Sequence, residues 1–275
     1  MSPAERSGTP PPEHHAPHHR VPLLTLKGKP GETLSLPLAF STPLRPDLIQ
    51  RAVVAAQSRR RQPHSTSPTA GVRHSVEWSG KGRGVARTPR LMDSMRGAQA
   101  PNTVGGRPAH PPKVETIWAK KVNAKERRLA FRSALAATRE PHLLKARGHD
   151  VPDGLHLPVV VEDPIESVSS AAEARAFLAT LALWDDVERA QDGVHVRAGR
   201  GKRRGRLRRG PKSLLVVTSG PGQARGFRNL SGVDVVAAPR LGTEDLAPGG
   251  TPGRLTVFSK AALTALGARA GGVAA

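Results

Sequence analysis

Residues 76–113 read VEWSGKGRGVARTPRLMDSMRGAQAPNTVGGRPAHPPK and set the architecture of the whole chain. Glycine and proline recur too often in this stretch for a helix or a strand to persist. In the wider segment 58–113, eleven lysines and arginines oppose only Glu77 and Asp93, a net charge of +9. Loops longer than about 12–15 residues are uncommon inside compact domains. We therefore expect residues 58–113 to form an extended loop that has no core of its own and is ordered by a polyanion.

The composition of the full chain points to the same kind of partner. Its 275 residues include 43 Lys/Arg and 22 Asp/Glu, a net charge of +21 with an isoelectric point near 11.6. Such an imbalance is typical of proteins that bind nucleic acids. A membrane is the weaker alternative, because the sequence has no basic amphipathic helix and no apolar run of about 20 residues. With five Phe, three Trp and no Tyr, we expect recognition of phosphates and shape, without base stacking on several aromatic side chains.

The sequence also argues against several classes of site. The chain contains no cysteine, which excludes disulfides, thiolate ligands and cysteine nucleophiles. Its first residues lack the apolar segment of a signal peptide, so we expect a cytoplasmic protein. The glycine-rich stretch 80–84 lacks the spacing of a dinucleotide-binding loop. Gly205 and Gly210 have the spacing of a phosphate-binding loop, but Pro211 stands at the lysine position and Lys212 comes one residue too late. No nucleophile or metal-ligand spacing accompanies His156, Glu162 and Asp163. We therefore predict no enzymatic activity, no cofactor, no metal and no small-molecule substrate.

Both ends of the chain have the composition of tails. Residues 1–20 are rich in proline and histidine, which is typical of disorder, and residues 271–275 are expected to be a flexible C-terminus. A transition-metal site at the N-terminal histidines would need a fixed scaffold or carboxylates beside them, so we favour a solvated tail. These histidines are His14, His15, His18 and His19.

Outside the long loop, the hydrophobic pattern predicts a single α/β domain over residues 21–270. Its first elements are a hairpin with strands at 21–26 and 32–37, a helix that begins at Pro46 and a helix that begins at Asn123. From residue 150 onward, short apolar runs alternate with helical patterns. This indicates a layered sandwich with a mostly parallel central sheet flanked by helices. The expected strands are 158–161, 214–217, 233–236 and 255–258, and the expected helices are 170–184 and 261–270.

Helix ends and helix faces are predicted from the same sequence. Capping boxes are expected where Asn123 precedes Glu126 and where Ser170 precedes Glu173 by three residues. In the helix that begins at Ser170, apolar residues share one face as far as Trp184, which we expect in the core. The helix that begins at Pro46 should bury a stripe formed by Ile49, Ala52, Val53 and Ala56.

A second basic segment occupies residues 197–212 and reads RAGRGKRRGRLRRGPK. Nine of its sixteen residues are Lys or Arg and none is acidic. Uncompensated positive charges in a short loop repel one another unless counter-charge is present, so RNA phosphate is favoured over a solvated charge run. For the basic face of the helix that begins at Asn123, RNA contact and simple solvation remain open alternatives. That face consists of Lys125, Arg127, Arg128 and Arg132.

Seven short motifs follow one another along the chain. They are RPDLI at 45–49, RHSVEWSGKGRGV at 73–85, VGGRPAHPPK at 104–113, RSALAAT at 132–138, PVVVED at 158–163, RNLSG at 228–232 and LAPGG at 246–250. In this order they resemble the family of the universal large-subunit ribosomal protein four, in its archaeal and eukaryotic form. The resemblance runs from about residue 21 to residue 270, which makes it specific.

The resemblance implies a structural constituent of the large ribosomal subunit that binds large-subunit rRNA and assists assembly, in the cytoplasm as part of the ribosome. It also implies neighbouring large-subunit ribosomal proteins as partners, and a long extension that lines part of the exit tunnel close to the nascent peptide. By position, the extension is the part of the long loop 58–113 around Lys81–Arg107, and its tunnel-near residues are Lys81, Arg83, Arg87 and Arg90. A free-standing nucleic-acid chaperone or DNA-compacting protein is the alternative, because it shares the charge without requiring these motifs.

Together, the two basic segments supply the residues that we expect to bind RNA. They are Arg59, Arg60, Arg61, Arg73, His74, Trp78, Lys81, Arg83, Arg87, Arg90, Arg96, Arg107, His110 and Lys113 in the first segment, and Arg197, Arg200, Lys202, Arg203, Arg204, Arg206, Arg208, Arg209 and Lys212 in the second.

Overall fold

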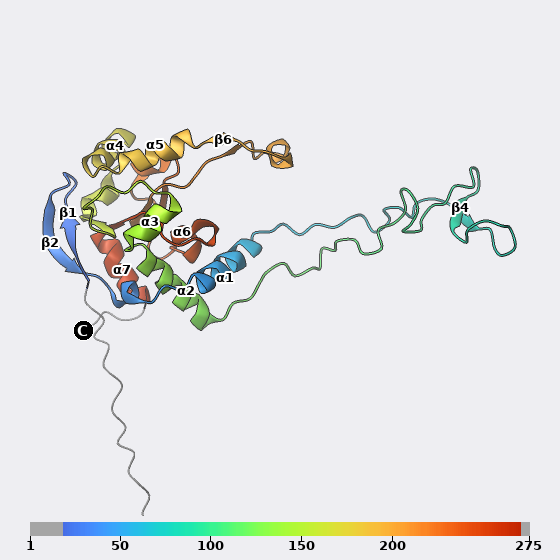
Figure 1. Cartoon of the computed structure of the whole chain (residues 1–275), viewed down its shortest axis with the longest axis horizontal. Helices are drawn as coiled ribbons and strands as arrows, with labels where there is room; N and C mark the ends of the chain where they lie inside the picture. Colours follow the sequence, from blue (N-terminus) through green and yellow to red (C-terminus); the bar gives the residue numbers. More distant parts are fainter. Residues whose placement is uncertain (1–18, 271–275) are drawn as a thin grey trace, which may run out of the picture. The chain divides into compact units, whose positions relative to one another are not determined.

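A computed structural model describes residues 19–270, which divide into two units (Figure 1). The first unit, here called the sheet unit, contains the chain up to Ala56 and from Lys121 onward. The second, the loop unit, is Gln57–Lys120. Most of the predicted N-terminal tail and all of the predicted C-terminal tail lie outside the described residues. His19 and Arg20 are described, and Arg20 begins the first strand.

A six-stranded sheet forms the centre of the sheet unit, with the strand order β2-β1-β5-β10-β8-β9. Only the edge strand β2 is antiparallel to its neighbour, and the other strands pair in parallel. Short apolar strands of this kind are typical of sheets with both faces covered. The expected hairpin, the four later strands and the mostly parallel sheet are therefore confirmed, within a few residues at each end. The strands are β1 (Arg20–Leu24), β2 (Pro30–Ser35), β5 (Val159–Val161), β8 (Leu215–Thr218), β9 (Asp234–Ala237) and β10 (Thr256–Ser259).

Helices pack on both faces of this sheet, and alternate strand residues divide between two cores. Val160, Val217 and Phe258 belong to the first core, with side chains of α1, α2 and α7. Val161 and Val216 belong to the second core, with side chains of α3, α4 and α5. The helices are α1 (Pro46–Ser58), α2 (Ala124–Ala137), α3 (Pro141–Arg147), α4 (Ala171–Thr180), α5 (Trp184–Asp192), α6 (Thr243–Leu246) and α7 (Lys260–Ala270).

Short 3₁₀ turns complete the described chain. They are η1 (Leu38–Ser41), η2 (Asp163–Ser167), η3 (Arg200–Arg204), η4 (Arg225–Asn229) and η5 (Pro248–Gly250).

The helix expected over 170–184 is wrong in one respect, because the chain forms two helices there. α4 ends at Thr180, and Ala182 has φ +52°, a left-handed conformation that interrupts the helical path. Trp184 therefore begins α5, where it is half-buried at the margin of the second core. The guanidinium of Arg175 lies 4.7 Å from the centre of its ring. The apolar pattern continues across the break because Leu181 and Leu183 are both buried on either side of it.

The expected helix starts are at the right residues, but the capping boxes are incomplete. Ser170 Oγ accepts a hydrogen bond from the backbone N–H of Ala172, which confirms Ser170 as the N-cap of α4. The bond goes to the second residue of the helix, whereas a capping box requires one from the third residue, Glu173. Asn123 is the N-cap of α2, yet its side chain makes no capping bond. The carboxylate of Glu126 instead pairs with Arg51 at 3.2 Å, which holds it away from the N-cap.

The buried stripe of α1 also departs from the expectation at one position. Ile49, Ala52 and Val53 are buried as predicted. Ala55 is buried in place of Ala56, which is exposed. The spacing from Ala52 to Ala55 is three residues, and spacings of three and four both keep side chains on one helix face.

Two small hairpins lie outside the central sheet. β3 (Val76–Trp78) pairs antiparallel with β4 (Pro89–Leu91) in the loop unit. β6 (His195–Val196) pairs antiparallel with β7 (Arg208–Arg209), so the second basic segment is mostly a hairpin loop. The expectation that residues 76–113 hold no regular element is wrong, because the glycine-rich sequence 79–88 serves as the connection of a short hairpin.

The loop unit consists of an outgoing and a returning chain segment that run beside each other to the β3–β4 hairpin (Figure 1). Gln99 Nε2 donates to the backbone oxygen of Val72 at 3.2 Å, which links the two segments. Gly71 has φ +80°, and a Cβ at that position would lie 2.5 Å from the backbone nitrogen of Arg107. Only glycine fits this close approach of two backbones.

Candidate nucleic-acid interface

The second basic segment forms a hairpin whose exposed end carries most of its basic side chains. Between β6 and β7, residues 200–204 form the 3₁₀ turn η3, and Gly199 and Gly205 flank it with φ of +76° and +78°. Apart from the half-buried Arg197, its lysines and arginines are exposed. Within residues 19–270, no ion pair involves any basic residue of the segment before Lys212. These cations are therefore available to an external anion.

Lys212 has a different role from the other basic residues of its segment. Its Nζ donates to both carboxylate oxygens of Asp234, each at 2.9 Å. The same carboxylate accepts a 2.6 Å bond from Arg254, whose side chain is buried. Burial raises the pKa of the Asp234 carboxyl, but the charges and hydrogen bonds of Arg254 and Lys212 outweigh this and hold the pKa below its usual value. Lys212 thus anchors the segment to the edge strand β9.

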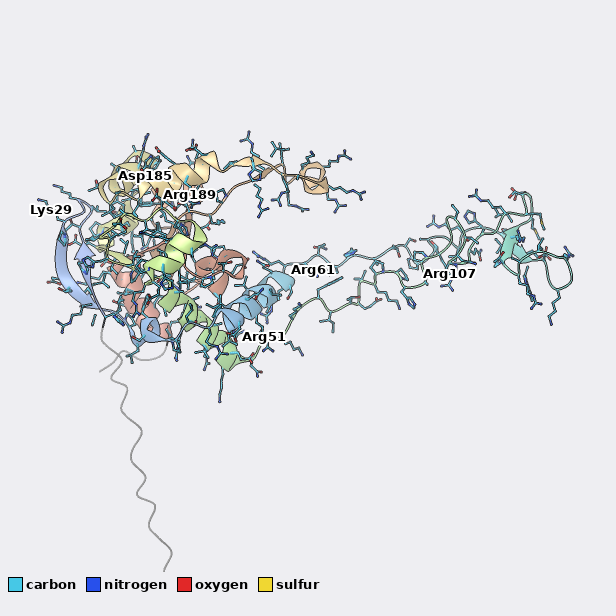
Figure 2. All side chains as sticks on the ribbon, viewed as in Figure 1. Lys29, Arg51, Arg61, Arg107, Asp185 and Arg189 are labelled. Carbon is cyan, nitrogen blue, oxygen red and sulfur yellow. The ribbon has the colours of Figure 1, made fainter. Side chains whose placement is uncertain are left out.

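A buried polar cluster around Asp186 fixes the same end of the segment. Asp186 accepts hydrogen bonds from Ser213 Oγ at 2.7 Å, Arg189 Nε at 2.9 Å and the backbone N–H of Asp150 at 3.1 Å, and His149 Nδ1 lies 3.1 Å away. Arg189 also donates to the backbone oxygen of Lys212 at 3.2 Å. Burial by itself raises the pKa of Asp186, but the bonds with His149 and Ser213 and the charge of Arg189 lower it overall. Figure 2 labels Arg189 and its neighbour Asp185 on α5.

In the loop unit, the basic residues lie along both chain segments (Figure 2). Arg90 is half-buried and donates to the backbone oxygens of Met95 at 2.9 Å and Ala86 at 3.4 Å, so it shapes the tip of the unit. The remaining predicted contacts are exposed. They are Arg59, Arg60, Arg61, Arg73, His74, Trp78, Lys81, Arg83, Arg87, Arg96, Arg107, His110 and Lys113.

Trp118 packs against Arg61, one of the residues predicted to contact RNA. The guanidinium of Arg61 lies 4.0 Å from the centre of its ring, and the ring of His64 is stacked at 5.9 Å. Trp118 Nε1 is buried without a hydrogen-bond partner among the described residues. The sequence prediction did not include this tryptophan, although it lies close to Lys120 and Lys121.

A third positively charged surface lies on the sheet unit, in a hollow of about 450 Å³. Arg127, Arg128 and Arg132 reach it from α2, and Arg269 reaches it from α7. Arg269 lies 4.8 Å from the centre of the Phe131 ring and donates to the backbone oxygen of Ala238 at 2.7 Å. No acidic residue lines the hollow. For three of its four arginines, Arg127, Arg128 and Arg132, the sequence left RNA contact and simple solvation as alternatives.

Neither a metal site nor a membrane span is found in the part of the chain that the structure describes. Within residues 19–270, no three His, Asp or Glu side chains are grouped so that they could hold a metal ion. In the same range, no helix has the length and the apolar character that crossing a membrane requires. Of the N-terminal histidines, His14, His15 and His18 lie outside the described residues.

Comparison with known proteins gives matches over nearly the whole chain. The model of the Ribosomal protein L4/L1 family matches residues 34–269. The large ribosomal subunit protein uL4 of Methanopyrus kandleri is 50% identical over 257 residues, which cover 91% of this chain and 99% of the relative. The uL4 proteins of Haloquadratum walsbyi and Methanosphaera stadtmanae are 47% and 44% identical, covering 86% and 90% of this chain and 95% and 96% of the relatives. The matched range includes both basic segments and the hollow beside α2.

Proposed function

The chain belongs to the Ribosomal protein L4/L1 family, and on this premise we propose that it is a structural constituent of the large ribosomal subunit that binds large-subunit rRNA. The observation that carries the proposal is the 50% identity to a uL4 protein over 91% of this chain and 99% of the relative. The relatives are named as components of a ribosomal subunit, not as enzymes. Its place would be the cytoplasm, in the ribosome, beside other large-subunit proteins.

Charge and exposure support binding to rRNA through the two basic segments. The exposed arginines between Arg200 and Arg209 have no carboxylate partner within residues 19–270, so their charges are available to neutralise phosphates. Neutralised phosphates release the counter-ions condensed on the RNA, which favours association at low salt. Guanidinium groups also bind phosphate oxygens with two parallel hydrogen bonds. The hollow beside α2 would add a third phosphate contact, through Arg127, Arg128 and Arg132.

The loop unit is the part that we propose to line the exit tunnel and to assist assembly by ordering rRNA. Residues 58–113 run out and back with about 28 residues each way, and an extended chain covers at most about 3.3–3.6 Å per residue, so the ceiling on reach is roughly 90–100 Å. Gly80, Gly82 and Gly84 have positive φ, and a Cβ added at any of them would meet no atom within 4 Å, so RNA backbone can approach them closely. The tunnel-near residues would be Lys81, Arg83 and Arg87, with Arg90 shaping the tip.

Reconstitution tests the proposed place in the subunit. Large subunits of an archaeal relative are assembled with this chain, carrying a tag, in place of the relative's own uL4 protein. We expect the chain to co-sediment with the subunits after a high-salt wash, at one copy per subunit, because many buried phosphate contacts dissociate slowly. A free-standing nucleic-acid chaperone or DNA-compacting protein, which the comparisons do not support, would be washed off. Loss of the chain in the wash would contradict the proposal.

Crosslinking tests the tunnel position. A photoreactive group at Arg87, which is exposed, is expected to label a stalled nascent peptide or tunnel-wall RNA in reconstituted subunits. The same group at Arg51, exposed on α1 of the sheet unit, is the matched control and is expected to label no nascent peptide. Labelling from position 87 that is confined to the chain's own residues would contradict the tunnel assignment.

A further inference from the structure

The tip of the loop unit contains a hollow of about 240 Å³ with an unusual lining. Trp78 and Ser79 border it at the end of β3, and Arg90 and Leu91 border it from β4. Drug-sized ligands occupy pockets of roughly 300–1,000 Å³, so this hollow is suited to a single small ring system. The other lining residues are Glu77, Arg83, Met92 and Met95.

Three large apolar side chains that line this hollow are exposed and do not pack in a hydrophobic core. Trp78 is 54% exposed, Met92 69% and Met95 50%. None of them belongs to either hydrophobic core of the sheet unit. Large exposed apolar side chains gathered in one place mark an interaction site more often than single scattered ones do. The tip therefore carries apolar surface for a partner.

The backbone at the tip is held in the shape that forms the hollow. Arg90 donates to the backbone oxygens of Met95 and Ala86, which ties the turn after β4 to the connection before it. Met95 has φ +52°, a left-handed conformation that is uncommon for a residue other than glycine and that is often found at functional sites. Two polar atoms at the border, Ser79 Oγ and Arg90 Nε, are buried without a partner among the described residues. Buried polar atoms without a partner are rare in folded proteins, and a bound ligand is one way in which they become paired.

The charges around the hollow select the class of partner. Arg83 lines it, and the exposed Lys81 and Arg87 lie in the same connection between β3 and β4. Glu77 is the only acidic residue of the lining. An apolar peptide segment would gain nothing from this excess of positive charge, whereas RNA offers a flat aromatic base and phosphates on either side of it. Aromatic side chains stack on unpaired bases, and thioethers pack favourably against ring edges.

We propose that this hollow holds one unstacked nucleobase of RNA, stacked on Trp78 and packed against Met92 and Met95, with Arg83 on a flanking phosphate. The proposal rests on the proposed function, because it specifies what part of the RNA the tip of the loop unit takes. It also revises the expectation that recognition depends on phosphates and shape alone. The proposed site stacks a single base on a single tryptophan, so the small number of aromatic residues in the chain does not argue against it.

Fluorescence of Trp78 tests the proposal directly. In the full-length variant Trp118→Phe, Trp184→Phe, Trp78 is the only tryptophan, and both replacements keep an aromatic ring. A short oligoadenylate is expected to quench its emission, because a stacked base quenches indole. An abasic oligonucleotide of the same length has the same phosphates without bases and is expected to leave the emission unchanged. Adding Met92→Ala and Met95→Ala should raise the Kd measured by quenching roughly 3-fold or more. Val104→Ala, 82% exposed in the same unit and outside the hollow, is the matched control.

Each other outcome overturns the base-binding proposal. Equal quenching by the two oligonucleotides would show that the tip binds phosphates only. Quenching by a short apolar peptide, with none by oligoadenylate, would show that the tip docks a protein segment. Filter binding of the same variant to large-subunit rRNA reports separately on the proposed function, so rRNA binding without base-dependent quenching would remove the base site and leave that function intact.

Discussion

Replacing Arg203, Arg204, Arg208 and Arg209 with glutamine will flatten the salt dependence of binding to large-subunit rRNA. A protein that contacts about 6–10 phosphates of a duplex loses on the order of 10³–10⁵ in affinity between 50 and 200 mM salt. Each phosphate contact contributes a slope of about 0.9 in log affinity against log salt, so losing four contacts lowers the slope by up to roughly 3–4. The affinity of the variant should therefore fall most at low salt. The measurement is filter binding to rRNA of an archaeal relative across a salt series.

A second variant with the same loss of charge separates local contact from long-range attraction. Lys29, Arg45, Arg51 and Lys145 are exposed, and the last three pair with Asp47, Glu126 and Asp153 in the sheet unit. Their replacement with glutamine also removes four positive charges, but we expect the slope to change by less than about one. If both variants flatten the slope equally, net charge governs binding. If neither does, the second basic segment is solvated when the chain is bound.

The sequence predicts the sheet of this protein better than its helix boundaries. Runs such as Pro158–Val161 leave no polar face, and a strand without a polar face must be covered on both sides. The break between α4 and α5 could not be predicted in this way. Its cause is a left-handed Ala182, and alanine gives no sequence signal for that conformation. The unused capping box at Asn123 has a similar origin, because Glu126 pairs with Arg51, 75 residues away in the sequence.

For the candidate interface, composition predicts which residues are basic but not which of them are free. The run from Arg200 to Arg209 and the nearby Lys212 look alike in the sequence, yet Lys212 is bound to Asp234. Arg90 resembles Arg87, but it donates to two backbone oxygens at the tip. The small hollow at the tip could not be predicted from the sequence either, because Trp78 and Met95 come to line one hollow only when β3 pairs with β4. The net charge of a segment can be counted from its sequence. Whether a basic side chain is free to bind a phosphate, and whether a hollow forms, depends on contacts between residues that are distant in the sequence.

Replacing Asp186 with alanine will cause the largest loss of stability among the single substitutions that the structure points to. The change leaves the buried side chains of His149 and Ser213 and the backbone N–H of Asp150 without their shared acceptor. Removing one partner of a buried charge pair typically costs about 3–5 kcal/mol, mainly because the remaining polar groups stay buried and unpaired. We expect a decrease of that size in the free energy of unfolding of the sheet unit, measured by urea titration. Asp186→Asn keeps the shape and one acceptor oxygen, and it should lose less.

The dependence of this loss on pH follows from the lowered pKa of Asp186. A carboxyl with a pKa lower in the folded than in the unfolded protein stabilises the fold above the ordinary value of 3.8, and this contribution disappears as the pH falls through the folded pKa. The difference in unfolding free energy between the wild type and Asp186→Ala should thus stay constant near neutral pH. It should narrow as the pH falls below about 3.8.

Asp185→Ala is the matched control for the effect of Asp186. Asp185 precedes Asp186 in the first turn of α5, is exposed, and shares only the favourable interaction of a carboxylate with the helix N-terminus. Its replacement should change the urea midpoint only slightly.

Because the Asp186 cluster holds Arg189 against the backbone of Lys212, Asp186→Ala should also speed trypsin cleavage at residues 208–212 in the folded protein. Equal stability of the two alanine variants, with equal cleavage rates, would show that the cluster neither stabilises the sheet unit nor anchors its basic segment.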